Sequence, residues 1–591
     1  MNRYGRKDRC ALSQVQLQGS YRSLDGRAVV GESLRRETKK TPSASILVLV
    51  VALVGACLLY VWAIAPDSFG FYHDDGIYVA TAKSLAEGHG YHIISVPGEP
   101  AQTKYPPFYP FLLSLIWRAY PRFPNNLPTM MSLSILATIV SLALTWLYLT
   151  SRRYASQWWA LAVIVPAAMN WRMIILATGI YSEMIYAALS IAALHLAEAH
   201  EQDKQSWKRP VGLGVMIGLA FLTRTPGIAL LIAVAAYYAL RGKTRRDFVP
   251  IAVGGLFVIL WVWWGYAHNT AGDGANSAYY TSYFRDFSEI IGELQKESGA
   301  SRLSTFLSLL GKNAMLITVS IPIVCVGIRY DSLQGLTGYG LAIGLTLLVV
   351  TLFLVVRGFL RVSAGGRRLI PIYVVSYLAL HLVWPYGVYD RFLMPLLPFL
   401  LLFLITELES LIQLARREFA SGERIAARFA AVALASAVTL LAGVAFYNHV
   451  TGVYHSLFSS KRNSAARAAD DREAIDWINA HTVASDVLVC YRDPRYYLYT
   501  GRKATRSTST TAGSAQGQEK QPEQAKIFRI IDQNDARYLI CTASDFALQS
   551  QPELQRQNLR TIIEENAQIF TPVFESENGQ SVIYRILGHA R

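Results

Sequence analysis

Ser43–Ala65 reads SASILVLVVALVGACLLYVWAIA, and shortly after it Phe71–Ala80 reads FYHDDGIYVA. The first stretch is apolar along its whole length, and roughly 20 apolar residues are enough to cross a bilayer. The second stretch places a histidine and two adjacent carboxylates close to where the apolar segment ends. Ionisable residues at the edge of a membrane are costly and usually functional. Together the two stretches predict a membrane protein with a functional site at one membrane surface.

The composition extends this prediction to the whole chain. Of 591 residues, 52% are hydrophobic and only 16% are charged, whereas about 25% are charged in a typical soluble domain. We therefore expect an all-α polytopic membrane protein with about eleven transmembrane helices, in a range of about 11–13. The expected spans are 44–65, 128–150, 157–170, 174–197, 211–223, 226–240, 248–267, 340–360, 369–384, 392–410 and 428–447.

The formal net charge of +15 has two interpretations, which are nucleic-acid binding and the excess of Lys and Arg in the cytoplasmic loops of membrane proteins. The second is favoured, so no nucleic-acid partner is expected. Residues 1–43 are polar and basic, and we expect a disordered cytoplasmic tail there. Loops 66–107 and 268–312 are expected outside. The basic residues gather in the short gaps Ser151–Arg153, Arg241–Arg246, Arg361–Arg368 and Ala415–Arg428.

The segment Asn313–Ile328 is apolar but short, and Pro322 interrupts it. If it crossed the membrane, Arg361–Arg368 and Ala415–Arg428 would face outside, against the charge rule. We therefore expect a re-entrant or interfacial hairpin, because broken backbone is tolerated at membrane depth where protein covers it. The odd number of spans that remains puts the N-terminus in the cytoplasm and the C-terminus outside.

Residues 451–591 differ in sequence pattern from the membrane part, which we expect to cover residues 44–450. Strand-like runs such as DVLVCY and RYLICT alternate with helix-like segments, which predicts a small external α/β domain. The Ser-, Thr-, Gly- and Gln-rich stretch 507–522 is expected to be a mobile linker. Cys490 and Cys541 end two of the strand-like runs, and spacing alone leaves open whether they form a disulfide.

Asp74 and Asp75 are the first candidates for chemistry. Neighbours on a helix point in different directions, so the pair is unsuited to flank a glycosidic bond as the two carboxylates of a hydrolase do. It suits two separate roles: one carboxylate is a general base towards a hydroxyl, and the other orients it or binds a cation. The plainer interpretation is a helix start, where Asp complements the helix dipole.

Three cations are predicted at the outer ends of spans, and they suit a phosphate group. Lys104 precedes two prolines that stiffen the chain, and Arg224 and Arg391 begin or end apolar runs. The alternative for each is a side chain that snorkels to the membrane interface. Arg391 has a second alternative, which is an ion pair with its neighbour Asp390.

Glu183 lies near the outer end of an apolar run, and an acid in that position usually faces a cavity. A role beside Asp74 is therefore expected. The histidines His73, His89 and His92 flank the acidic pair. They and a carboxylate are a candidate site for a divalent metal, although histidines on a surface are more common, and no cofactor is certain.

Four motifs in this order resemble the GT-C superfamily of membrane glycosyltransferases. The resemblance is nearest to the bacterial relatives of protein O-mannosyltransferases (family 39) and of the lipid A aminoarabinose transferase, and it covers roughly residues 44–450. The motifs are HDDGIYVATAKSLAEGHGY (His73–Tyr91), TKYPPFYPFLLS (Thr103–Ser114), GLAFLTRTPG (Gly218–Gly227) and YDRFLMPLLPFLLLF (Tyr389–Phe403).

The resemblance implies an inverting transfer of a sugar from a polyprenyl-phosphate carrier to a hydroxyl of a lipid, glycan or protein, at the outer face of a bacterial cell (inner) membrane. In such enzymes the first acid of an Asp-Glu pair is catalytic, and Asp74 matches it. Asp75 stands where Glu is common, which leaves its role open. Lys104 matches the lysine of a KxPP element, and an acid is frequent near Glu183.

Two other classes of protein share part of this pattern. A lipid-linked polysaccharide polymerase also has a large external loop and arginines for phosphate, but it gives no reason for the acidic pair in the first loop. A polytopic transporter more often has repeated halves.

Overall fold

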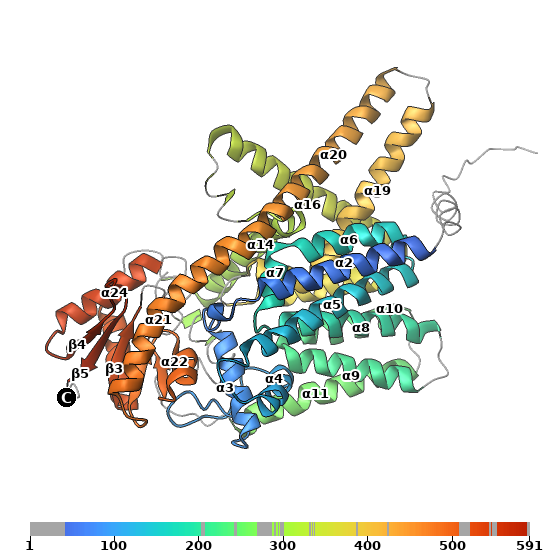
Figure 1. Ribbon diagram of the computed structural model, residues 1–591. Helices are drawn as coiled ribbons and strands as arrows, with labels where there is room; N and C mark the ends of the chain where they lie inside the picture. The colour runs from blue at the N-terminus through green and yellow to red at the C-terminus, as the bar shows by residue number, and fades with distance from the viewer. Residues whose placement is uncertain are drawn as a thin grey trace, which may run out of the picture.

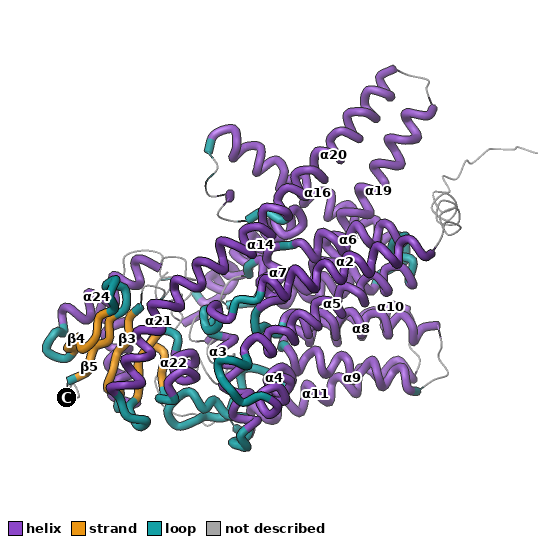
Figure 2. The backbone as a smooth tube through the Cα atoms, in the orientation of Figure 1, coloured by secondary structure: helices purple, strands orange, loops and turns teal. Residues whose placement is uncertain are grey.

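The computed structural model describes residues 42–587, apart from the gaps named at the end of this paragraph. The described residues form a bundle of helices with a small sheet and its helices at one end (Figures 1 and 2). The prediction of a polytopic helical protein with a C-terminal α/β domain is confirmed. The expected tail and most of the linker 507–522 lie outside the described residues. The gaps are 203–206, 242–244, 269–286, 289–290, 293–294, 296–298, 300, 330–331, 334, 336, 386–387, 422–424, 508–519, 543–544 and 546–551.

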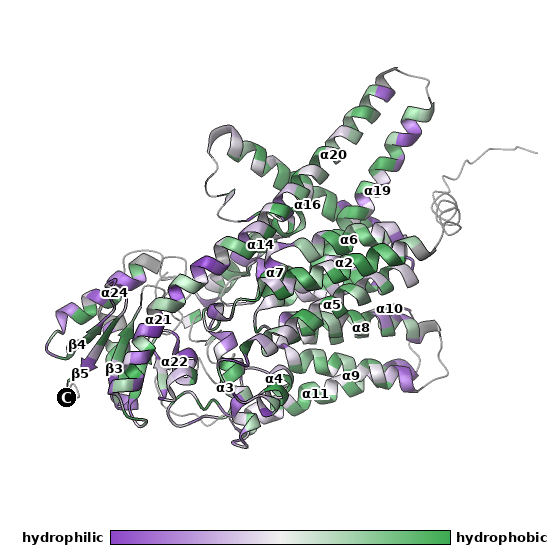
Figure 3. Cartoon of the chain, viewed as in Figure 1, coloured by the Kyte–Doolittle hydropathy of each residue, from purple (hydrophilic) through white to green (hydrophobic). Residues whose placement is uncertain are grey.

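The first half of the bundle follows the expected apolar segments, and its helices carry mostly hydrophobic residues (Figure 3). By length and composition, seven helices in the described ranges are able to cross a membrane, or eight if one bent pair counts as a single span. The count is below eleven in part because the expected spans 226–240 and 369–384 fall on short apolar helices, Thr225–Arg241 and Leu369–Leu382. The helices of this first half of the bundle, whether or not they are long enough to cross a membrane, are α2 (Pro42–Ala63), α5 (Leu127–Ser151), α6 (Gln157–Met169), α7 (Trp171–Thr178), α8 (Glu183–Gln202), α9 (Lys208–Thr223), α10 (Ile228–Arg241) and α11 (Phe248–Ala267).

The expected span 174–197 is divided between two helices. Asn170 caps α7 by accepting hydrogen bonds from the backbone amides of Arg172 and Met173, which lets a new helix start directly after α6 at a bend of 65°. Gly179 is extended and ends α7. The chain then restarts as α8, so that Glu183 is the first residue of a helix rather than a residue within one.

The hairpin expected at Asn313–Ile328 is wrong, because α14 (Arg302–Val326) is one continuous helix. Asn313 resembles a boundary in the sequence, but it is buried and donates hydrogen bonds to the carbonyls of Leu382 and Trp384 at 2.9 and 2.7 Å. Asn170 in turn donates to the carbonyl of Val324. Hydrogen bonds at Asn313 and at Val324 therefore join α14 to other parts of the bundle.

The second half of the bundle is α16 (Gly338–Ala364), α17 (Leu369–Leu382), α18 (Asp390–Leu393), α19 (Leu397–Ser421) and α20 (Ile425–Tyr454). Helix α20 continues through a π-helical turn, His455–Ser460, into α21 (Lys461–His481) without a loop. The expected boundary between 450 and 451 thus falls inside a helix. Figure 1 shows α20 and α21 as one rod from the far end of the bundle to the C-terminal sheet.

A mixed five-stranded sheet forms the core of the C-terminal domain, in the order β2-β1-β3-β5-β4. The strands β2, β1 and β3 are parallel, and β5 is antiparallel to β3 and β4. Cys490 and Cys541 are both free thiols. The elements are β1 (Val487–Cys490), α22 (Asp493–Thr500), β2 (Ala504–Arg506), α23 (Lys520–Asn534), β3 (Ala536–Cys541), α24 (Pro552–Glu565), β4 (Phe570–Glu575) and β5 (Val582–Ile586).

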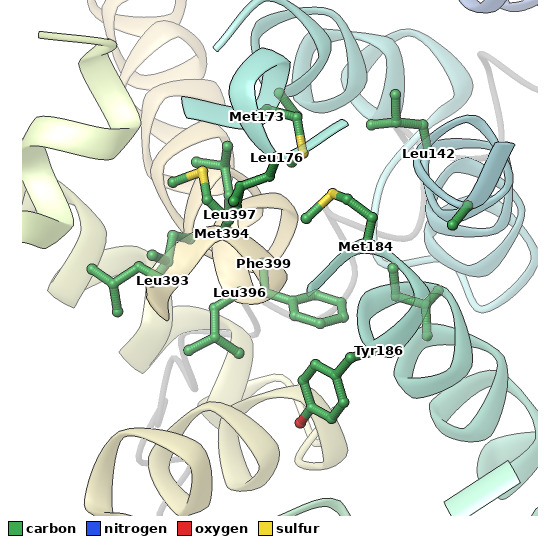
Figure 4. Packing of buried hydrophobic residues seen from close by; sticks show 14 of the residues in the cluster. Leu142, Met173, Leu176, Met184, Tyr186, Leu393, Met394, Leu396, Leu397 and Phe399 are labelled. Carbon is green, nitrogen blue, oxygen red and sulfur yellow. The ribbon is translucent and has the colours of Figure 1, made fainter. Parts of the chain in front are cut away.

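The core of the bundle packs directly behind the first residues of α8 and α19. Met184 and Tyr186 from α8 meet Leu396, from the turn just before α19, and Phe399, from the start of α19, and all four are buried (Figure 4). A close-packed interior of this kind resists displacement of its backbone. Glu183, the first residue of α8, and Arg391, which lies in α18 shortly before α19, are therefore held in fixed positions relative to each other.

Candidate active site

Asp74 is the first residue of α3 (Asp74–Ala86), which lies between α2 and α4 (Phe108–Ala119). The residue before it, His73, has φ 63° and ψ −46°. A non-glycine residue with positive φ costs about 1–3 kcal/mol and persists only where its surroundings hold it. The turn that carries Asp74 is therefore strained, and contacts elsewhere in the molecule must hold it.

The carboxylate of Asp74 is held on both oxygens. The hydroxyl of Tyr105 donates to Oδ1 at 2.7 Å, and Nη2 of Arg391 donates to Oδ2 at 2.9 Å. Burial raises the pKa of Asp74, but Arg391 and the Tyr105 hydroxyl outweigh it and hold that pKa below its ordinary value. A carboxylate offers about four lone-pair positions, so Asp74 can accept a further hydrogen bond on its exposed side.

Glu183 connects the two arginines of the site. Its side chain is fully buried, and Oε1 pairs with Nη1 of Arg224 at 2.7 Å and with Nε of Arg391. Oε2 of Glu183 has no hydrogen-bond partner among the described residues. Because Arg391 also pairs with Asp74, the two acids predicted to act side by side are joined through one guanidinium.

A cavity of about 240 Å³ opens beside these groups. Its polar lining includes Asp74, Lys104, Arg224 and Arg391, so four of the residues predicted from sequence meet at one cavity. Lys104 is only 3% exposed, which argues against a side chain that snorkels to the interface. The remaining lining residues are Tyr72, Tyr78, Tyr105, Pro106, Thr223, Thr225, Pro226, Trp384 and Phe392.

Arg224 owes its position to a break between two helices. Helix α9 ends at Thr223, Arg224 is extended, and the turn Thr225–Gly227 leads into α10. The turn folds back so closely that a Cβ at Gly227 would lie 2.6 Å from Cα of Phe221. The RTPG sequence therefore builds a tight corner that aims one arginine into the cavity.

Asp75 points away from the cavity. Its Oδ2 accepts from the amide of Gly70 at 2.7 Å and its Oδ1 from the amide of Gly76 at 2.9 Å. Burial is the main reason that the pKa of Asp75 rises to about 6. The structure thus separates the two carboxylates, and Asp75 shapes the turn in front of α3.

The three candidate metal ligands are not brought together. His73 is buried and bonds through Nε2 to Oδ1 of Asp493 at 2.7 Å, while His89 is exposed and His92 bonds through Nδ1 to the carbonyl of Glu99. Within the described residues, no group of three or more His, Cys, Asp or Glu side chains is arranged to hold a metal ion.

Two partners of the site were not anticipated from the sequence. The hydroxyl of Tyr105, the residue between Lys104 and the prolines, donates a hydrogen bond to Asp74. Nε of Arg172 pairs with Oδ2 of Asp390 at 2.9 Å. Arg391 is therefore paired with Glu183 and Asp74 through its side chain, rather than with its neighbour. One feature of the sequence indicated that these residues belong to the site: the KYPP segment and the YDR segment each lie next to an apolar run.

Part of the sequence is similar to a known protein family. Residues 104–265 match the family model described as dolichyl-phosphate-mannose-protein mannosyltransferase, a range that contains Lys104, Glu183 and Arg224. No curated protein matches the sequence.

Two solved structures resemble most of the chain. The archaeal oligosaccharyltransferase AglB from Archaeoglobus fulgidus, in complex with an inhibitory peptide and a dolichol-phosphate, is 12% identical, with 92% of this chain and 74% of that chain covered at a TM-score of 0.51. ArnT from Cupriavidus metallidurans in the apo state is 13% identical, with 92% and 98% covered at a TM-score of 0.51. At this identity the likeness is one of fold. The chain shares its fold with AglB and ArnT, and the resemblance predicted from its motifs is confirmed at the level of the fold.

Proposed function

We propose that this protein is a membrane glycosyltransferase that moves a sugar, a hexose or a pentose, from a polyprenyl-phosphate carrier to a hydroxyl of a lipid, glycan or protein acceptor. The observation that carries the proposal is a single cavity that contains an ionised acid, Asp74, together with Lys104, Arg224 and Arg391. The family model and the dolichol-phosphate bound by AglB support this choice of donor.

The residues suit a direct displacement with inversion. The acceptor hydroxyl donates a hydrogen bond to Asp74, which receives the proton as the hydroxyl oxygen bonds to the anomeric carbon. The bond between that carbon and the phosphate oxygen breaks, and its electron pair leaves with the lipid phosphate. A phosphate needs no proton in order to leave, but it does need positive charge where its own charge grows.

The balance of charge agrees with such a donor. Lys104, Arg224 and Arg391 face two acids, Asp74 and Glu183, which leaves one net positive charge among these five residues. A sugar linked to a lipid through phosphate carries one negative charge, and the lipid monophosphate product carries about 1.5–2 at neutral pH. The site is therefore better matched to the departing group than to a neutral sugar.

Neither alternative class explains this arrangement as well. The transport of a solute does not require an acid on a strained turn, and the action of a polysaccharide polymerase gives no role to the turn that carries Asp74. The function is tested by deleting the gene and extracting lipids. We expect one polyprenyl-phosphate sugar to accumulate, and the purified protein in vesicles should consume that lipid when an acceptor is added. An unchanged lipid profile, together with no consumption, would reject the proposal.

Lys104→Ala should weaken donor binding as well as turnover, because a buried cation on the cavity wall touches the phosphate in both the ground state and the transition state. The loss of one charge-assisted hydrogen bond of about 1.5–3 kcal/mol predicts roughly 10- to 150-fold weaker binding of undecaprenyl phosphate. Calorimetric titration measures it. Lys503→Ala, which removes a lysine that pairs with Glu99 outside the cavity, is the control and should bind normally. Equal affinities for wild type and Lys104→Ala would remove Lys104 from the phosphate site.

We propose that the N-terminus is cytoplasmic and that the C-terminal domain is periplasmic or extracellular. The start of α2 and the C-terminal sheet lie at opposite ends of the bundle (Figure 1), and the basic gaps favour the cytoplasm for the end at which α2 begins. Tags at Met1 and Arg591 should be accessible from opposite sides of the membrane in protease protection. If both tags report the cytoplasm, the proposed orientation and the odd number of spans are wrong.

A further inference from the structure

The C-terminal domain reaches the strained turn in front of Asp74 through one short segment. This segment, Arg492–Arg495, follows β1 and forms the first turn of α22. It leaves the sheet at the carboxyl ends of the parallel strands, which is where open α/β sheets usually bind ligands. Here that edge holds a piece of the same chain, residues 69–76.

Buried polar contacts join the segment to the turn. Asp493 is fully buried and bonds to Nε2 of His73 at 2.7 Å, and the guanidinium of Arg495 donates to the carbonyl of Phe69. Burial lowers the pKa of His73, so its ring is neutral at pH 7 and donates to the carboxylate. The bond therefore fixes the ring of the residue whose φ is positive.

Shape complements these bonds. The guanidinium of Arg492 lies 4.4 Å from the centroid of the Phe71 ring, and the guanidinium of Arg495 lies 5.2 Å from it. A Cβ at Gly70 would lie 2.8 Å from the side chain of Arg495, so the backbone of the turn touches that side chain directly. Asp471 from α21 pairs with both arginines and holds them in place from behind.

We propose that the Arg492–Arg495 segment positions the turn that carries Asp74, with Asp493 as the positioning residue. Asp493 does not line the cavity. It acts on catalysis only by holding His73, the neighbour of Asp74, in a conformation that the chain would otherwise leave. This inference rests on the proposed function for its kinetic readout, but the contact itself is measurable without any substrate.

Asp493→Ala should lower kcat by about 10- to 100-fold, since misplacing a reacting group by about 1 Å has an effect of that size. The KM for the lipid donor should stay unchanged, because Lys104 and Arg224 belong to other elements. Asp493→Asn should retain most of the activity, since its amide oxygen still accepts from neutral His73. His73→Ala removes the same bond without altering the C-terminal domain and should reproduce the loss.

The test uses the full-length protein in vesicles. Kinetics are measured for the wild type and for Asp493→Ala, Asp493→Asn and His73→Ala, and hydrogen exchange is followed over residues 69–76 and over β1. Faster exchange at 69–76 with unchanged exchange at β1 is expected for Asp493→Ala and His73→Ala. Arg472→Ala, which breaks an exposed pair with Asp67 between the same two parts of the chain, is the control and should alter neither. Unchanged exchange at 69–76, a rise in KM that accounts for the loss, or an Asp493→Asn variant as slow as Asp493→Ala would overturn the proposal. Failure of the wild type to transfer any sugar would reject the proposed function, and the exchange result would still decide the positioning role.

Discussion

Asp74→Asn should abolish measurable transfer while the protein still folds and still binds its donor lipid. The amide keeps the shape of the side chain and can accept from Tyr105, but it cannot take a proton from an acceptor hydroxyl. Removing a general base typically lowers a rate by about 10²–10⁴-fold. Arg391 retains Glu183 as a partner, so the wall of the cavity should remain in place. Sugar transfer in vesicles and binding of undecaprenyl phosphate are the two measurements.

The adjacent carboxylate is the matched control for this experiment. Asp75→Asn removes an equal charge one residue away, but from a side chain that faces the amides of Gly70 and Gly76 instead of the cavity. Its effect on the rate should be much milder than that of Asp74→Asn. Near-normal transfer by Asp74→Asn would reject Asp74 as the base and move that role to Asp75 or Glu183.

Arg391→Ala should have the second largest effect, on both activity and stability. Its guanidinium joins Asp74 to Glu183 and lines the cavity, so the variant loses a cation at the departing phosphate and the partner that orients the base. One such donor is typically worth about 10²–10³-fold in rate. Breaking a buried ion pair also destabilises a protein by up to about 3–5 kcal/mol. We expect a loss of at least about 10³-fold in kcat and a lower Tm in detergent.

Two further variants separate these effects. Arg391→Lys keeps the charge but not the planar fork that serves two acids, so it should recover part of the stability and little of the activity. Arg361→Ala is the matched control, because Arg361 and Arg357 share the buried Glu407 much as Arg391 and Arg224 share Glu183. It should leave transfer unchanged. Transfer by Arg391→Ala within about tenfold of wild type would contradict a role for this residue at the phosphate.

The parts of the fold that follow from local pattern were predictable. Long apolar runs give α2, α5 and α20, and the strand-like runs around Val487 and Tyr538 give β1 and β3. Errors arose where tertiary contacts replace solvent as the partner of a polar group. Asn313 resembles the end of an apolar segment, yet it lies within α14, and its side-chain NH2 group donates to the carbonyls of Leu382, the last residue of α17, and of Trp384.

The same reason limits what was predictable in the site. Lys104, Arg224 and Arg391 stood out because each is a cation beside an apolar run, and the structure brings all three to one cavity. No spacing rule could have linked His73 to Asp493, which are 420 residues apart in sequence. The local pattern, a histidine beside two carboxylates, instead predicts a metal ligand.

The uninterrupted rod of α20, the π-turn and α21 has a mechanical consequence. A loop at the membrane surface would let the C-terminal domain reorient freely, whereas a continuous helix acts as a lever whose inner arm lies in the bilayer. Helix α21 is 21 residues long, or about 30 Å, so a tilt of about 5° in the rod displaces its outer end by about 3 Å. Helix tilt responds to the thickness of the hydrocarbon layer. Because Arg492–Arg495 contacts residues 69–76, a tilt of this rod would also shift the contacts that hold the turn in front of Asp74.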